Sequence, residues 1–149
     1  MCTLYQGDAA KVLQDLPAES VDLCVTSPPW FGLRDYKVDG QIGLEKTPEE
    51  WLEHILAVFR EVRRVLRPWG TAFIEIGDSY AASGGAHAEH HKNPGLSSSW
   101  ERDGVPHWGE LGQAGHYLAP LGLKPLDLLG IPFRLALALQ AEGWYLRSV

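Results

Sequence analysis

The sequence has few cysteines, no long apolar run and no internal repeat. Cys2 and Cys24 are too few for a disulfide framework, and the apolar surroundings of Cys24 favour a reduced thiol. A membrane-spanning helix needs about 18 or more apolar residues in a row, and no stretch is that long. The first residues, MCTLYQGDAA, also lack the basic and apolar segments of a signal peptide. We therefore expect a cytoplasmic protein without a membrane partner.

An excess of positive charge is missing as well. The formal net charge is -6 at pH 7, which disfavours a protein that coats nucleic acid through charge alone, although it is compatible with a local basic surface. The length of 149 residues and the hydrophobic content of 45% are typical of one domain with a sizeable core.

Three apolar stretches predict β-strands. Residues 21–26 (VDLCVT) have the pattern of a buried strand, and residues 3–6 and 71–77 are further candidates. The strand at 21–26 must stop at Pro28, because proline lacks the N–H that a central strand donates to its neighbour.

Helical patterns separate these strands. Asp8 is placed to N-cap a helix over residues 9–17. Thr47, Pro48 and Glu50 form the pattern of a capping box at the start of a long helix with one apolar stripe. The stripe consists of Trp51, Leu52, Ile55, Leu56, Phe59, Val62, Val65 and Leu66. Strands that alternate with helices predict an α/β fold with a parallel sheet.

Ligands of such sheets bind where the strands end. Asp8, Ser27 and Asp78 each follow a predicted strand, so we expect Ser27 and Asp78 at one edge of the sheet, with Asp78 acting either as a turn residue or as a ligand. Residues 81–122 are rich in Gly, Ser, His and Pro and predict an irregular, mobile insertion. A helix at about 125–141 and a strand from about Trp144 should follow.

The tip of the strand at 21–26 carries unusual chemical groups. An exocyclic amine of a nucleobase is a poor nucleophile, because its lone pair is delocalised into the ring. Two acceptors against its two protons would draw it toward a tetrahedral geometry, and the Ser27 side chain and the Pro28 carbonyl are a rigid pair of such acceptors. Trp30 could stack on a base that has been lifted from the duplex.

These residues, in the string TSPPW, resemble the catalytic tetrapeptide of DNA amino-methyltransferases, (Asp/Asn/Ser)-Pro-Pro-(Tyr/Phe/Trp). The likeness extends over the chain except for the middle insertion, and it is to the group in which this motif precedes the cofactor motif. It implies a catalytic motif made of Ser27, Pro28, Pro29 and Trp30, acting on double-stranded DNA. It also implies that S-adenosyl-L-methionine binds near Asp8, Thr26 and Ser27, with Asp8 toward the adenine.

The resemblance implies a site-specific methyltransferase with a partial Rossmann-like fold. The serine at the first motif position is similar to enzymes that methylate cytosine N4, and adenine N6 is the alternative. The family's Phe-x-Gly-x-Gly cofactor motif has no counterpart, since Gly84-Gly85-Ala86 follows no apolar strand. We therefore expect residues 1–149 to be one incomplete catalytic domain, without its C-terminal strands and inactive alone, whose partner is a missing C-terminal half.

Two other functions remain open at this stage. The chain could be a truncated remnant that does no chemistry, or a metal-binding module built on His87, His90 and His91, although no cysteine has the spacing of a zinc site. Arg34 could contact phosphate or pair with an acidic neighbour. Trp100 and Trp108 could stack on bases or anchor the insertion.

Overall fold

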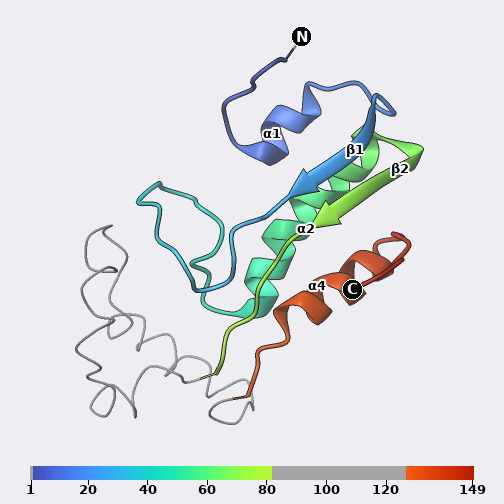
Figure 1. Ribbon diagram of the computed structural model, residues 1–149. Helices are drawn as coiled ribbons and strands as arrows, with labels where there is room; N and C mark the ends of the chain where they lie inside the picture. Colours follow the sequence, from blue (N-terminus) through green and yellow to red (C-terminus); the bar gives the residue numbers. More distant parts are fainter. Residues whose placement is uncertain (1, 82–126) are drawn as a thin grey trace, which may run out of the picture. The chain divides into compact units, whose positions relative to one another are not determined.

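The computed structural model describes residues 2–81 and 127–149 (Figure 1). Along the chain, the elements are α1 (Ala9–Gln14), β1 (Val21–Thr26), α2 (Pro48–Val65), β2 (Leu66–Ile74) and α4 (Ile131–Ala141). The chain divides into two compact units. The first unit contains Met1–Pro28, Leu52–Ile76 and Arg134–Val149, and the second contains Pro29–Trp51 and Gly77–Phe133.

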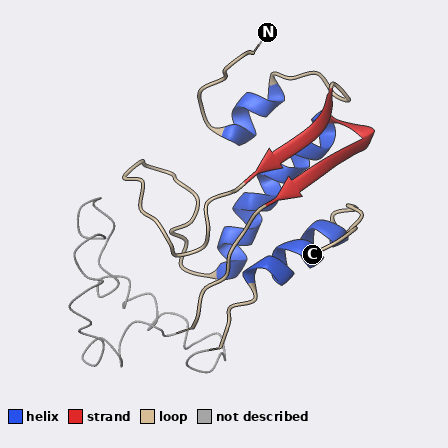
Figure 2. Cartoon of the chain, in the orientation of Figure 1, coloured by secondary structure: helices blue, strands red, loops and turns tan. Residues whose placement is uncertain are grey.

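The sheet of the described residues is formed by β1 and β2, which pair in parallel (Figure 2). Cys24 lies opposite Ala72, Val25 opposite Phe73 and Thr26 opposite Ile74. Helix α2 connects the two strands and lies behind them in this view, so the three elements form a β–α–β unit. The predicted parallel sheet of an α/β protein is confirmed for these two strands.

The apolar stripe of α2 forms the core of the first unit. Ile55, Leu56, Phe59, Val62 and Val65 are all buried. At the start of the helix, the Thr47 hydroxyl accepts a hydrogen bond from the Glu50 amide at 3.1 Å, as the capping pattern predicts. The Glu50 carboxylate accepts from the Lys46 amide, at 3.1 Å, instead of from the Thr47 amide. Of the two hydrogen bonds of the predicted capping box, the one to the Thr47 hydroxyl is confirmed, and the one from the Thr47 amide to Glu50 is not.

Strand β2 begins and ends earlier than predicted. It follows α2 directly at Leu66 and ends at Ile74, not at residue 77. The pairing is irregular at its start, because Val21 lies opposite Leu66 whereas Leu23 lies opposite Thr71. The additional residues in this bulge include Pro68, which has no N–H to contribute to a regular ladder.

Two predicted strands, at 3–6 and from Trp144, are wrong for this structure, because neither segment is extended in a ladder. A strand requires a neighbour to satisfy its N–H and C=O groups, and within the described residues these segments have none. Leu4 is accordingly 92% exposed. Trp144 instead packs against the core of the first unit, where its ring meets Phe59 edge-on at a centroid distance of 6.1 Å.

The predicted start of the last helix at about 125 is also wrong in its described part. Residues 127–129 are extended: the Ala81 amide donates to the Asp127 carbonyl at 2.7 Å, and the Leu129 amide donates to the Ser79 carbonyl at 2.8 Å. Gly130 then adopts a φ of +72°, and α4 begins at Ile131. The insertion predicted at 81–122 lies outside the described residues from 82 onward.

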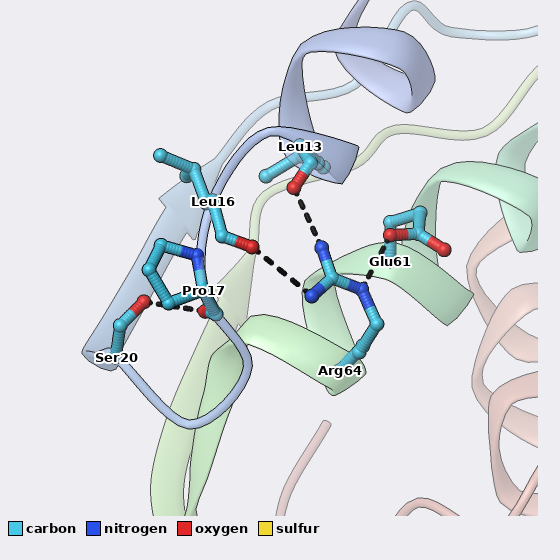
Figure 3. Close-up of polar contacts among 6 residues, drawn as sticks. All are labelled: Leu13, Leu16, Pro17, Ser20, Glu61 and Arg64. Carbon is cyan, nitrogen blue, oxygen red and sulfur yellow. Dashed lines mark hydrogen bonds and ion pairs between the residues drawn. The ribbon is translucent and has the colours of Figure 1, made fainter.

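An arginine of α2 holds α1 in the first unit (Figure 3). The Arg64 guanidinium donates to the carbonyls of Leu13, at 2.7 Å, and Leu16, at 3.0 Å, and also to the Glu61 carboxylate at 2.7 Å. Six-residue helices such as α1 are marginal in isolation, so these contacts, to one carbonyl in its last turn and one just beyond its end, should be needed for its order. No helix of the described residues has the length and apolar character needed to cross a membrane.

We expect Arg64→Gln to loosen α1. The change removes charge-assisted hydrogen bonds to two backbone carbonyls, with a cost of about 1.5–3 kcal/mol in the free energy of unfolding. Hydrogen exchange of the amides at 12–16 should accelerate. Arg60→Gln is the matched control, because Arg60 lies one turn earlier on α2 and pairs with Glu142 at 2.6 Å. Equal acceleration in both variants would contradict the assigned role of Arg64.

Candidate active site

The carboxyl ends of β1 and β2 bring Ser27 next to an acidic side chain. The last ladder contact is donated by the Glu75 amide to the Thr26 carbonyl, at 2.9 Å. One residue further along, the Ser27 hydroxyl donates to the Glu75 carboxylate at 2.5 Å. Ser27 and Glu75 are both exposed, so this pair is open to solvent at the edge of the sheet. The prediction that Ser27 lies at the carboxyl edge is confirmed.

This hydrogen bond determines which hydrogen-bonding groups of Ser27 remain available. A carboxylate only accepts hydrogen bonds, so the hydroxyl proton is directed to Glu75 and the lone pairs of Ser27 Oγ remain free to accept from another donor. The apolar pattern predicts Glu75 inside the strand at 71–77, whereas β2 ends at Ile74 and Glu75 follows it. Its position was nevertheless informative, since the residue after a parallel strand lies at the same edge as the residue after its neighbour.

The two prolines of the motif have different surroundings. The Pro29 carbonyl accepts a hydrogen bond from the Trp51 indole N–H at 2.9 Å. Trp51 is fully buried and meets Phe31 edge-on at 6.5 Å, so the Pro29 carbonyl is anchored within the second unit. The Pro28 carbonyl, which belongs to the first unit, accepts no hydrogen bond from the described residues. Pro28 is buried, and of the two carbonyls only that of Pro29 has a hydrogen-bond donor among the described residues.

The ring of Trp30 packs against Gly77 within the second unit. A Cβ atom added at Gly77 would overlap the six-membered part of the Trp30 ring, so a side chain at this position would displace the tryptophan. Gly77 therefore sets the position of the aromatic residue of the motif. The sequence pattern predicts Gly77 only as the end of a strand and gives no sign of its contact with Trp30.

Asp78 has a structural role in the second unit. Its carboxylate accepts from the amides of Ser79 at 2.9 Å, Gly130 at 3.0 Å and Ile131 at 3.1 Å. The last two amides are at the N-terminus of α4, where a negative charge is stabilising. Of the two roles considered from the sequence, the turn residue fits these contacts.

Asp8 caps α1, as predicted. One oxygen of its exposed carboxylate accepts from the Lys11 amide at 3.1 Å. The other oxygen has no hydrogen-bond partner among the described residues, so Asp8 can cap the helix and still accept from a ligand. Cys24 is half-buried, and burial raises the pKa of its thiol, which favours the protonated and unreactive form.

The remaining candidates contribute less to the described site. Arg34 is exposed, and its backbone carbonyl accepts a hydrogen bond from the Gln41 side-chain amide at 2.9 Å. The three histidines, Trp100, Trp108 and the Gly-Gly-Ala segment of the insertion all lie outside the described residues. Within residues 2–81 and 127–149, no group of three His, Cys, Asp or Glu side chains is placed to hold a metal ion.

Comparison with models of known protein families identifies the family of this chain. Residues 21–149 match the N6/N4 methyltransferase family, described as DNA methylase. The chain belongs to this DNA methylase family. The match includes the tetrapeptide at 27–30, Glu75 and the whole β–α–β unit.

Relatives of this DNA methylase chain include three with matches over nearly its full length. It is 47% identical to the Type II methyltransferase M.XycI of Xanthomonas campestris pv. cyanopsidis, covering 98% of this chain and 44% of that protein. Identity to M.Cfr9I of Citrobacter freundii is 46%, with the same coverage. Identity to M.SmaI of Serratia marcescens is 41%, covering 99% of this chain and 46% of that protein. The chain therefore spans less than half the length of these relatives. No solved structure matches it.

Trp51→Phe tests whether the indole N–H holds the motif loop. The variant keeps an aromatic ring but leaves the Pro29 carbonyl without its donor, so we expect the free energy of unfolding to fall by about 1–3 kcal/mol. Urea denaturation measures this change. Trp69→Phe is the control, because Trp69 is exposed on the bulge of β2 and should change stability by no more than about 0.5 kcal/mol. Similar losses in the two variants would mean that the hydrogen bond to Pro29 contributes little.

Proposed function

We propose that this chain is the catalytic-motif part of a site-specific DNA methyltransferase that modifies the exocyclic amine of a flipped base. The observation that carries the proposal is the Ser27 hydroxyl, which donates to Glu75 at the end of β1 and is followed directly by Pro28, Pro29 and Trp30. Family membership and the Type II methyltransferase names of the relatives support the same reaction class.

The two acceptors of the first unit match the two protons of the amine. Ser27 Oγ has free lone pairs because its proton is directed to Glu75, and the Pro28 carbonyl has no partner among the described residues. With one acceptor against each N–H, the nitrogen would pyramidalise and its lone pair would become available for attack. Because the proline backbone and the Glu75 contact hold both oxygens in advance, little reorganisation is needed during the reaction.

The same contacts provide a path for the proton that the amine must lose. As the methyl group moved from the donor sulfur to the amine, the C–S bond would break, the donor would leave as a neutral thioether, and the nitrogen would become positively charged, so that one N–H would become acidic. That proton passes to Ser27 Oγ, and the serine proton passes along the 2.5 Å hydrogen bond to the Glu75 carboxylate. The serine is regenerated, Glu75 becomes neutral, and the methylated amine leaves without charge. Glu75 would return its proton to solvent, to which it is exposed.

The described residues could bind only one part of the methyl donor, its adenosyl end. S-adenosyl-L-methionine would supply an electrophilic methyl group on a sulfonium sulfur. Asp8 would hold its adenosyl end through the carboxylate oxygen that is not used in capping α1, and Thr26 and Ser27 would border it. The chain has no Phe-x-Gly-x-Gly segment to let its backbone approach the donor closely. We therefore propose that a second polypeptide segment, within the part of the relatives that this chain does not cover, completes the cofactor site.

The serine at position 27 favours cytosine N4 over adenine N6 as the acceptor. Trp30 would stack on the flipped base, which is sequence-tolerant and therefore compatible with either base. The substrate would be double-stranded DNA in the cytoplasm, in the setting of a restriction–modification system. Nuclease digestion of the product DNA and mass spectrometry of the nucleosides would distinguish N4-methylcytosine from N6-methyladenine.

The first activity prediction concerns whether the cofactor site of the chain alone is complete. Incubated with labelled S-adenosyl-L-methionine and DNA, the purified chain should transfer little or no label. Addition of the uncovered part of the Xanthomonas relative as a second polypeptide should restore transfer, because it would supply the missing donor site. Ser27→Ala should then lower transfer about a hundredfold, by removal of one preorganised hydrogen-bonding group, and Trp30→Ala should also lower it. Robust labelling by the chain alone would refute the incomplete cofactor site, and no labelling in any combination would favour the inactive remnant.

The second activity prediction concerns Glu75. In the reconstituted enzyme, Glu75→Gln keeps an acceptor for the serine hydroxyl but cannot take up a proton, so kcat should fall about a hundredfold. The KM for DNA should change little, since the variant alters the reacting centre and not the binding of the duplex. Glu53→Gln, an exposed change on α2, is the matched control. An unchanged kcat in Glu75→Gln, or a rise in KM alone, would exclude the proton path.

A further inference from the structure

A glutamine side chain forms hydrogen bonds across the loop that follows Trp30. We call this loop, residues 32–43, the Gln41 loop. The Gln41 side-chain oxygen accepts from the Tyr36 amide at 2.6 Å, and the side-chain nitrogen donates to the Arg34 carbonyl at 2.9 Å. Because one partner is a donor and the other an acceptor, both ends of the carboxamide are used. Gln41 thus holds the backbone on both sides of residue 35.

The Gln41 loop is also closed at its base, within the second unit. The Gly32 amide donates to the Gly43 carbonyl at 2.7 Å. Gly43 is buried and has a φ of +113°, which residues with a side chain rarely adopt. A Cβ atom added at Gly43 would lie 3.1 Å from the Trp30 carbonyl oxygen, so the end of the loop packs against the backbone of the motif. The loop is therefore held at its base by Gly43 and at its middle by Gln41.

The two basic residues of the Gln41 loop have different surroundings. Lys37 borders a shallow hollow together with Asp35 and Asp39, the two acidic residues of the loop, so its charge is balanced locally. The Asp35 carboxylate also accepts from the Lys37 amide at 2.6 Å. Arg34 is exposed and does not line this hollow. The Arg34 guanidinium is therefore better placed than the Lys37 ammonium to bind an anion.

We propose that Gln41 is a positioning residue for Arg34, and that Arg34 binds a backbone phosphate of the DNA beside the flipped base. Arg34 follows Trp30 by four residues, so at most about 14 Å separates their Cα atoms. At that distance from a base stacked on Trp30, the guanidinium reaches the phosphates that flank the base, and its planar fork matches their oxygens. Because Gln41 orders the Arg34 backbone in advance, less conformational entropy is lost on binding.

The salt dependence of DNA binding tests this contact. The full chain is mixed with the uncovered part of the Xanthomonas relative, and binding to a labelled duplex of random sequence is followed by fluorescence anisotropy at several salt concentrations. Arg34→Gln should weaken binding about tenfold, and the steepness with which log K falls with log salt should decrease by about 0.9, the value for one phosphate contact. Gln41→Ala should change both quantities in the same direction. It should add nothing in the Arg34→Gln background, because Gln41 acts through Arg34.

Two controls separate this contact from general effects of charge and of glutamine loss. Lys37→Gln removes a positive charge from the same loop and should leave the salt dependence unchanged. Gln14→Ala removes an exposed glutamine from α1 and should leave binding within about twofold. Hydrogen exchange of the Tyr36 amide should accelerate in Gln41→Ala and not in Gln14→Ala, since only the first variant loses its acceptor. Circular dichroism that matches the wild type confirms that each variant is folded.

The outcomes distinguish the phosphate contact from the reaction. The proposal rests on the proposed function because it takes Trp30 as the residue that stacks on the flipped base, but it concerns DNA binding. The expected salt dependences would support it even if the complex transfers no methyl group, in which case the proposed reaction alone fails. An unchanged salt dependence in Arg34→Gln, additive losses in the double variant, or no binding of the duplex would each overturn it. Equal decreases in Arg34→Gln and Lys37→Gln would overturn it in favour of a general attraction by the loop.

Discussion

The described fold depends on the parallel pairing of β1 and β2 across the crossover helix α2. The buried stripe of α2 fixes the sheet from one side, and the ladder then aligns the carboxyl ends of the two strands. The final contact, from the Glu75 amide to the Thr26 carbonyl, places the next side chains of both strands within hydrogen-bond distance. The Ser27–Glu75 pair is therefore a consequence of strand register, and a shift of one residue would abolish it.

The prolines that follow Ser27 serve structure and chemistry together. They end β1 because they cannot donate to the ladder, and their carbonyls are consequently released from the sheet. One of these carbonyls, that of Pro29, is used within the second unit by Trp51, whereas that of Pro28 has no partner among the described residues. A motif that looks like a simple strand terminator thus provides one anchored and one unused acceptor.

Several polar side chains of this chain form hydrogen bonds to the backbone at helix ends. Asp8 caps α1, Asp78 caps α4, and Arg64 binds the C-terminal carbonyls of α1. Each of these side chains satisfies N–H or C=O groups that a helix terminus leaves without partners. Asp8 and Asp78 both follow predicted strands, yet only the Asp8 carboxylate retains an oxygen without a partner in the described chain, so the two aspartates are not equivalent candidates for ligand binding.

The sequence by itself determined the elements whose signals are local: the strand at 21–26, the cap by Asp8, the Thr47 cap of α2 and the tetrapeptide that identifies the family. Periodicity and capping depend on neighbours in the chain, so they can be read without a fold. Only the tertiary structure decided which extended segments became strands, because residues 3–6 and the segment after Trp144 lack a hydrogen-bond neighbour in the described chain. It also decided the role of Glu75, since the contact to Ser27 joins residues far apart in sequence and exists only because two parallel strands end side by side.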